Sequence, residues 1–129
     1  MADISFDSSG KARFPTKHHG EVTLSKGKWD TICGQPERLY YRFNGEKIAT
    51  TLINPDEVRH HRKEPTQFFY YKQFATIRLS NDVEVPLTGC RYFAVVIDQS
   101  TGRICTVYPV PKPKEGQKFK GRGGPNERD

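Results

Sequence analysis

The densest group of side chains that could do chemistry lies between residues 59 and 72. A basic run at residues 59–63 (RHHRK) is followed by an aromatic run at residues 68–71 (FFYY) and by Lys72. Cationic groups bind phosphates and aromatic rings stack on unpaired bases, so this mixture is typical of RNA recognition. The residues expected to bind nucleic acid here are Arg59, Lys63, Tyr70 and Tyr71.

Cleavage of RNA without a metal is the reaction that these residue types favour. It requires a base for the 2′-hydroxyl proton, an acid for the leaving oxygen, and positive charge beside the transition state. Histidine titrates near neutral pH and fits either proton-transfer role, whereas arginine and lysine stabilise developing charge. Adjacent residues of a strand project to opposite faces, so only one histidine of the pair can face a given cleft. The candidate catalytic residues are His60, His61, Arg62, Lys72, Thr106 and Tyr108.

A second interpretation assigns these residues no chemistry. The basic run would then form a solvated edge strand whose charge discourages pairing with other chains. The tyrosines would pack as amphipathic core residues. The sequence leaves both interpretations open.

No metal or cofactor is expected. Adjacent histidines such as His18 and His19 do not converge on one ion, and Cys33, Cys90 and Cys105 lack the close spacing of zinc ligands. An odd number of widely spaced cysteines is typical of reduced thiols, which predicts a cytoplasmic protein.

The charge of the chain indicates its partner. A formal net charge of +6 over 129 residues favours a polyanion, and we expect RNA. The alternative is a basic surface that only maintains solubility. No long apolar run or charged-then-apolar N-terminal signal is present, so we expect no membrane partner.

Hydrophobic periodicity predicts two helices followed by strands. The helices are expected over Lys26–Cys33 and Asn44–Ile53, and Glu21–Leu24 is expected to form a short edge strand before them. Residues 21–112 would form a single α+β domain, between a flexible N-terminal arm (1–20) and a disordered basic tail (113–129). The later strands are expected over Val58–Lys63, Gln67–Phe74, Thr76–Leu79, Arg91–Asp98 and Arg103–Val110.

The last hairpin predicts which side chains share a face. A three-residue loop that ends at a left-handed Gly102 would place Cys105 and Val107 on one core face with alternate residues of the preceding strand, Phe93, Val95 and Ile97. The opposite face is the expected working surface, and it carries Ala94, Val96, Ile104, Thr106 and Tyr108.

Several segments resemble the phage-associated branch of the ribonuclease superfamily that groups barnase, EndoU, colicin-type tRNases and RelE toxins. The resemblance covers about Lys28 to Val110 and rests on KWDTICGQPERLYY, INPDEVR, FFYYK and YFAVVIDQSTGRICTVYPV. It implies two N-terminal helices packed on one face of a four- to five-stranded antiparallel sheet, with the active site on the open face. It also implies a basic or histidine residue from an early strand, a central cation and a hydroxyl from the last strand; these correspond to residues 60–62, Lys72, and Thr106 or Tyr108.

The function expected from the sequence is a metal-independent endoribonuclease, toxin-like or phage-linked, that cleaves RNA by 2′-hydroxyl attack. A cognate inhibitor protein would be its second partner. The alternatives are a non-catalytic nucleic-acid-binding module and a protein-interaction module of the immunity type. Catalysis requires that an imidazole, Lys72 and Thr106 converge on one concave face, and it is excluded if these side chains point apart or lie under the helices.

Overall fold

The computed structural model describes residues 4–38, 40–89, 91–113 and 117–118. Most of its regular elements are strands, and its two α-helices each have eight residues. In chain order the elements are β1 (Lys11–Pro15), β2 (Glu21–Ser25), α1 (Lys26–Cys33), the 3-10 helices η1 (Pro36–Arg38) and η2 (Tyr41–Phe43), α2 (Glu46–Ile53), β3 (Glu57–His60), β4 (Gln67–Gln73), β5 (Thr76–Arg78), β6 (Glu84–Pro86), β7 (Tyr92–Asp98), β8 (Arg103–Val110) and β9 (Gln117–Lys118).

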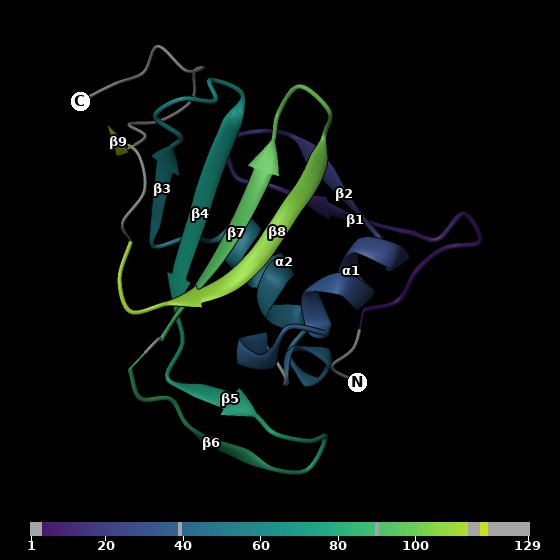
Figure 1. The fold of residues 1–129 in the computed structure, drawn as a ribbon, viewed down its shortest axis with the longest axis vertical. Coiled ribbons are helices and arrows are strands. Elements are labelled where there is room, and N and C mark those ends of the chain that lie inside the picture. Colours follow the sequence, from purple (N-terminus) through teal and green to yellow (C-terminus); the bar gives the residue numbers. More distant parts are fainter. Residues whose placement is uncertain (1–3, 39, 90, 114–116, 119–129) are drawn as a thin grey trace.

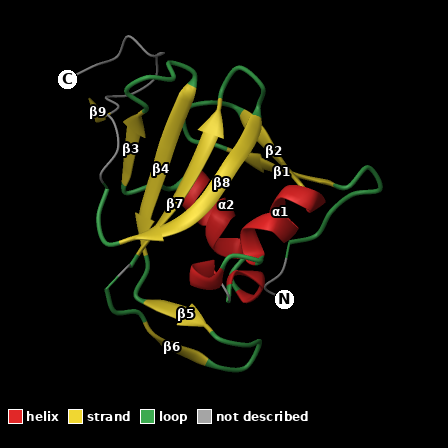
Figure 2. Ribbon diagram, viewed as in Figure 1, coloured by secondary structure: helices red, strands yellow, loops and turns green. Residues whose placement is uncertain are grey.

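One mixed sheet in the order β1-β2-β8-β7-β4-β3-β9 forms the centre of the molecule. It curves into a half-barrel, and α1 and α2 lie on one of its faces (Figures 1 and 2). The pairing is antiparallel throughout except between β2 and β8, which run parallel where Thr23 meets Arg103. The β5–β6 hairpin forms a separate two-stranded sheet that projects beyond one end of the large one (Figure 1).

The predicted fold class, two N-terminal helices on a four- to five-stranded antiparallel sheet, is wrong. Two strands precede the helices, and β2 joins the sheet through the parallel pair with β8. Residues 11–15, expected in a flexible arm, form β1; its signal is weak because only Ala12 and Phe14 of this short edge strand point into the core. The predicted tail lies mostly outside the described residues, although residues 117–118 pair with β3.

The helix boundaries follow the local sequence. Helix α1 matches the predicted Lys26–Cys33, and the Ser25 side chain caps it by accepting the Lys28 backbone N–H at 3.1 Å. Helix α2 begins two residues later than predicted, at Glu46, and its N-cap residue is Gly45. The buried Asn44 amide instead donates to the carbonyls of Tyr40 and Arg78 and accepts the Arg78 N–H, so it ties β5 to the chain before α2.

Strand alternation divides the apolar residues between the two faces of the sheet. The helix-covered face holds the main core, where Trp29, Ile48 and Leu52 of the helices are buried against the strands. The other face, called the open face below, is the one opposite α1 and α2. It carries a smaller cluster of buried residues: Phe69, Tyr71, Ala94, Val96 and Val110.

The β7–β8 hairpin contains a bulge that changes which side chains share a face. Gly102 has the predicted left-handed backbone, with φ of +67°, and its N–H donates to the Asp98 carbonyl at 2.8 Å. Asp98 pairs with Arg103, so the loop is one residue longer than predicted, and Cys105 is left unpaired as a bulge. Ile104 consequently joins the helix-covered core and Cys105 joins the open face, the reverse of the prediction.

Candidate functional site

The two histidines of the predicted catalytic set lie in different environments. His60 pairs with Phe68 on the helix-covered face, where it is fully buried with its ring 5.5 Å from that of Phe68. His61 lies in the loop after β3 and stacks on Phe69, a residue of the open face, at a centroid distance of 5.5 Å. Its Nδ1 accepts two backbone N–H groups of the same loop, each at 3.0 Å. Of the two histidines, only His61 contacts a residue of the open face.

Lys72 and Thr106 also lie on opposite faces. Lys72 pairs with Phe93 on the helix-covered face, and its Nζ lies 3.4 Å from Asp56 Oδ1. Thr106 pairs with Val96 on the open face. The imidazole of His60, the ammonium of Lys72 and the hydroxyl of Thr106 therefore do not converge. The structure does not form the predicted catalytic arrangement from these residues.

The predicted tyrosines are buried to different extents on the two faces. Tyr70 is fully buried on the helix-covered face, whereas Tyr71 is buried on the open face and stacks on Phe69 at 6.1 Å. Tyr108 is half-buried against the same open-face cluster. The open face thus brings Tyr71 and Tyr108 together. Neither Tyr70 nor Tyr71 exposes its ring for stacking on a base.

The basic residues around β3 differ in their partners. Arg59 forms an ion pair with Glu57, with Nη2 2.6 Å and Nε 2.7 Å from Oε2. Arg62 and Lys63 are exposed in the β3–β4 loop, and neither forms an ion pair within the part of the chain that the structure describes. The positive charge that this segment offers to a ligand is therefore that of Arg62 and Lys63.

A polar cluster on the helix-covered face was missed from the sequence. His19, in the β1–β2 turn, stacks on Phe68 at 4.0 Å and places Nδ1 2.5 Å from the Tyr70 hydroxyl, which also accepts the His18 backbone N–H at 3.3 Å. Burial, with a smaller contribution from His18, lowers the pKa of His19 to about 4. Burial raises the pKa of Tyr70 to about 12. Both groups are neutral near pH 7, and the hydrogen bond between the hydroxyl and Nδ1 ties the turn to β4.

Ion pairs engage most carboxylates of the described residues. Arg13 binds Asp7 at 2.5 Å, for example, and Arg42 binds Asp30 at 2.7 Å. Several cations remain without an ion pair within the described ranges, and they carry the excess positive charge of the molecule. These unpaired cations are Lys11, Lys17, Lys28, Arg62, Lys63, Arg91, Arg103 and Lys112.

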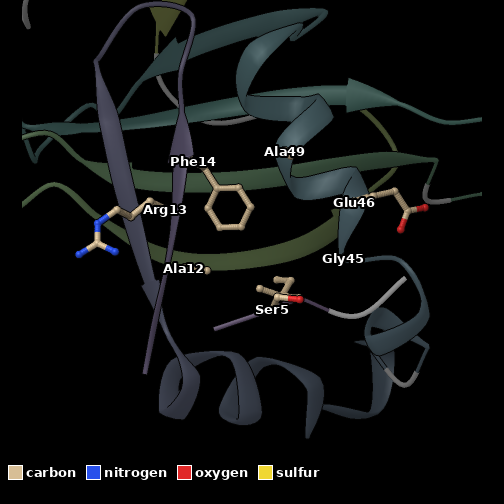
Figure 3. Close-up of a pocket in the computed structure, with 8 residues that line it drawn as sticks. Ser5, Ala12, Arg13, Phe14, Gly45, Glu46 and Ala49 are labelled. Carbon is tan, nitrogen blue, oxygen red and sulfur yellow. The ribbon is translucent and has the colours of Figure 1, made fainter. Parts of the chain in front are cut away.

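Two cavities are lined mainly by apolar residues. One, of about 220 Å³, lies between the N-terminal segment, β1 and α2, and Arg13 and Glu46 point away from its apolar wall at Phe14 (Figure 3). The other, of about 270 Å³, lies beside the β5–β6 hairpin and is lined by Ile77, Leu87 and other apolar residues, with Arg91. Neither brings together the several convergent polar groups that a binding site requires.

A third cavity, of about 270 Å³, is basic. It lies where β1, β2 and β8 meet the first turn of α1. We call it the basic pocket and define it by its lining residues, Lys11, Thr23, Ser25, Lys28, Arg103 and Ile104.

Further comparisons place the chain in no family. Within the described residues, no three His, Cys, Asp or Glu side chains are grouped so that they could hold a metal ion. No helix of this part of the chain is both long enough and apolar enough to cross a membrane. Searches against protein-family models, curated proteins and solved structures found no match to this chain. The resemblance to the ribonuclease superfamily therefore stays a prediction.

Proposed function

We propose that this protein binds a nucleic-acid strand through phosphate contacts beside its open face, and that it does so without the predicted cleavage chemistry. The observation that carries the proposal is the distribution of the unpaired cations. Arg62 and Lys63 lie in the β3–β4 loop, and the basic pocket lies across the sheet, on the side of β1, β2 and β8. Two groups of unpaired cations thus flank the open face.

The two groups are connected at one end of the sheet. The Gln99 N–H of the β7–β8 turn donates to the Thr66 carbonyl of the β3–β4 loop at 2.7 Å, and both segments lie at the same end of the sheet (Figure 1). Arg103 follows this turn directly. A strand that crosses the turn would contact Arg62 and Lys63 on one side and the basic pocket on the other. Phosphate contacts of this kind supply affinity without sequence preference.

Cleavage has less support than binding. Proton transfer requires groups within hydrogen-bonding reach of one phosphate, and His60 and Lys72 lie on the face opposite Thr106. His61 is the remaining candidate, and the acceptor position of its Nδ1 is occupied by two backbone N–H groups. Binding requires only accessible positive charge, which Arg62 and Lys63 provide.

Binding to labelled single-stranded RNA and DNA oligonucleotides at several salt concentrations tests this proposal. Each phosphate contact contributes about 0.7 to the slope of log K against log salt for single strands. We expect the double variant Arg62→Gln, Lys63→Gln to lower the magnitude of that slope by about 1.4, because two contacts are lost. The matched control Arg91→Gln, Lys112→Gln removes two unpaired cations that lie just before β7 and just after β8. It should leave the slope unchanged.

Two results would contradict the proposal. The first is the absence of binding to either nucleic acid at low salt. The second is an equal loss of affinity in the two double variants, which would indicate a diffuse charge effect. A gel of the same RNA after incubation with EDTA provides a separate test of cleavage, and cuts that disappear in His61→Ala would restore the catalytic interpretation.

A further inference from the structure

We infer that the basic pocket binds a phosphate group through Lys11, Lys28 and Arg103. The inference rests on the proposed function only for the source of that phosphate, a nucleic-acid strand. The pocket itself is assembled from segments far apart in the sequence: the first residue of β1, the first turn of α1 and the first residue of β8.

Strand pairing places these residues together. Lys11 of β1 pairs with Ser25 of β2, and Thr23 of β2 pairs with Arg103 of β8. The neighbouring residues Ala12, Leu24 and Ile104 are buried in the helix-covered core. Because side chains alternate along a strand, the paired residues are directed away from that core.

Helix α1 adds the third cation, Lys28, and two N–H groups of its first turn are already bonded. The Lys26 N–H donates to the Gly10 carbonyl at 2.9 Å, and the Lys28 N–H donates to Ser25 Oγ at 3.1 Å. The Ser25 hydroxyl accepts that bond and keeps its own proton for a ligand. The Thr23 hydroxyl donates to the Gly102 carbonyl at 3.3 Å, so its proton is not available to a ligand. The pocket therefore offers three cations and one neutral donor.

The carboxylates near the pocket are engaged with other groups. Arg13 binds Asp7 at 2.5 Å and lies 4.0 Å from Glu21. Asp98, which pairs with Arg103 across the β7–β8 ladder, accepts the N–H and the hydroxyl of Ser100 at 2.9 and 2.6 Å. None of the three pocket cations forms an ion pair with a residue in the described ranges. The pocket thus holds three cations that no carboxylate binds directly, which favours an anionic ligand.

A phosphate group matches this donor set better than a carboxylate does. The arginine fork binds two phosphate oxygens at once, and each lysine acts as a point charge toward the remaining oxygens. A carboxylate presents two oxygens in one plane, whereas the oxygens of a phosphate are arranged tetrahedrally and can be contacted from several directions. The phosphate could be the terminal monoester of a strand or an internal phosphodiester. Both present anionic non-bridging oxygens, three in the monoester and two in the diester, and the experiment below distinguishes them.

The test combines a small probe with two forms of one oligonucleotide. Pyrophosphate is titrated into ¹⁵N-labelled protein, and an octanucleotide with either a 5′-phosphate or a 5′-hydroxyl is titrated separately. The pocket variant is Lys28→Gln, Arg103→Gln. The matched control, Arg62→Gln, Lys63→Gln, removes the same charge outside the pocket. Unfolding midpoints of both variants verify that the fold is retained.

We expect pyrophosphate to shift the backbone signals of Thr23, Ser25, Lys28 and Arg103 in the wild type and the control, and not in the pocket variant. Loss of two charge-assisted contacts should weaken oligonucleotide binding by about tenfold or more. A 5′-phosphate preference that disappears in the pocket variant identifies a terminal monoester as the ligand. Equal binding of both oligonucleotides, weakened equally in that variant, identifies an internal phosphodiester.

Unmoved pocket signals together with wild-type oligonucleotide affinity in the pocket variant would overturn the inference. The proposed function would then still stand on the β3–β4 loop if the control variant bound less tightly. A different result is that pyrophosphate shifts the signals of the pocket residues while neither oligonucleotide binds. That result would support the phosphate site and reject nucleic acid as its source.

Discussion

The helix-covered face and the open face of the sheet use the same residue types differently. Beneath the helices, His60 is fully buried and Tyr70 binds His19. Their immediate neighbours in sequence, His61 and Tyr71, both stack on Phe69 of the open face. His61 also accepts two N–H groups of its own loop. The comparison shows that the face of the sheet, and not the residue type, decides whether a histidine stabilises the core or stays near solvent.

The largest expected difference between the faces is in stability. His60→Ala should lower the free energy of unfolding by about 2–4 kcal/mol, because truncation of a fully buried side chain leaves a cavity. His61→Ala should cost less than about 1 kcal/mol, because the N–H groups that it leaves unbonded are exposed to water. Urea unfolding followed by circular dichroism measures both. Equal losses in the two variants would contradict the assignment of the histidines to different faces.

A second, smaller effect is expected at Tyr70. Tyr70→Phe removes the hydroxyl that is hydrogen-bonded to His19 Nδ1 and accepts the His18 N–H, and it should cost about 1–3 kcal/mol. Tyr40, 39% exposed, provides the control. Tyr40→Phe should change stability by no more than about 0.5 kcal/mol. If the two variants unfold at the same urea concentration, the hydroxyl of Tyr70 has no structural role.

The third prediction concerns pH. The pKa of His19 is lowered from 6.5 to about 4 by burial first and by His18 second, so the folded protein favours the neutral imidazole. Its contribution to stability is fully present above pH 6.5 and is lost as the pH falls from 6.5 toward 4, because the unfolded chain binds the proton first. Urea unfolding between pH 7 and pH 4 should show this loss, and His19→Gln should reduce the slope. An NMR titration midpoint of His19 near 6.5 would contradict it.

The smallest expected effect compares the cysteines of the two faces. Cys33 is buried in the helix-covered core, whereas Cys105 is half-buried on the open face. Burial, and then the charge of Asp98, raises the pKa of the Cys105 thiol, and Lys28 opposes them. Because Cys105 is more exposed than the buried Cys33, iodoacetamide should nevertheless modify Cys105 first, as mass spectrometry of peptides would show. Lys28→Gln should slow modification of Cys105, because it removes a neighbouring positive charge that favours the thiolate.

The elements with strong local signals were predictable. Helix α1 was located from its apolar spacing, and strand β8 from its alternation. The left-handed Gly102 was predicted from the hairpin sequence. The face on which some side chains of β8 lie was not predictable. The bulge at Cys105 changes that face, and no residue of the strand indicates a bulge. The adjacent pair His18 and His19 was visible, but not its contact with β4.

The sequence by itself determined where most helices and strands lie and that the chain carries excess positive charge, since both depend on composition and on spacing between near neighbours. Tertiary structure alone decided that Lys11, Lys28 and Arg103 share a pocket while His60 and Lys72 lie away from Thr106. The physical reason is that pairing between distant strands is selected by burial of whole faces. A shift of one residue in such a pairing moves every side chain to the opposite face.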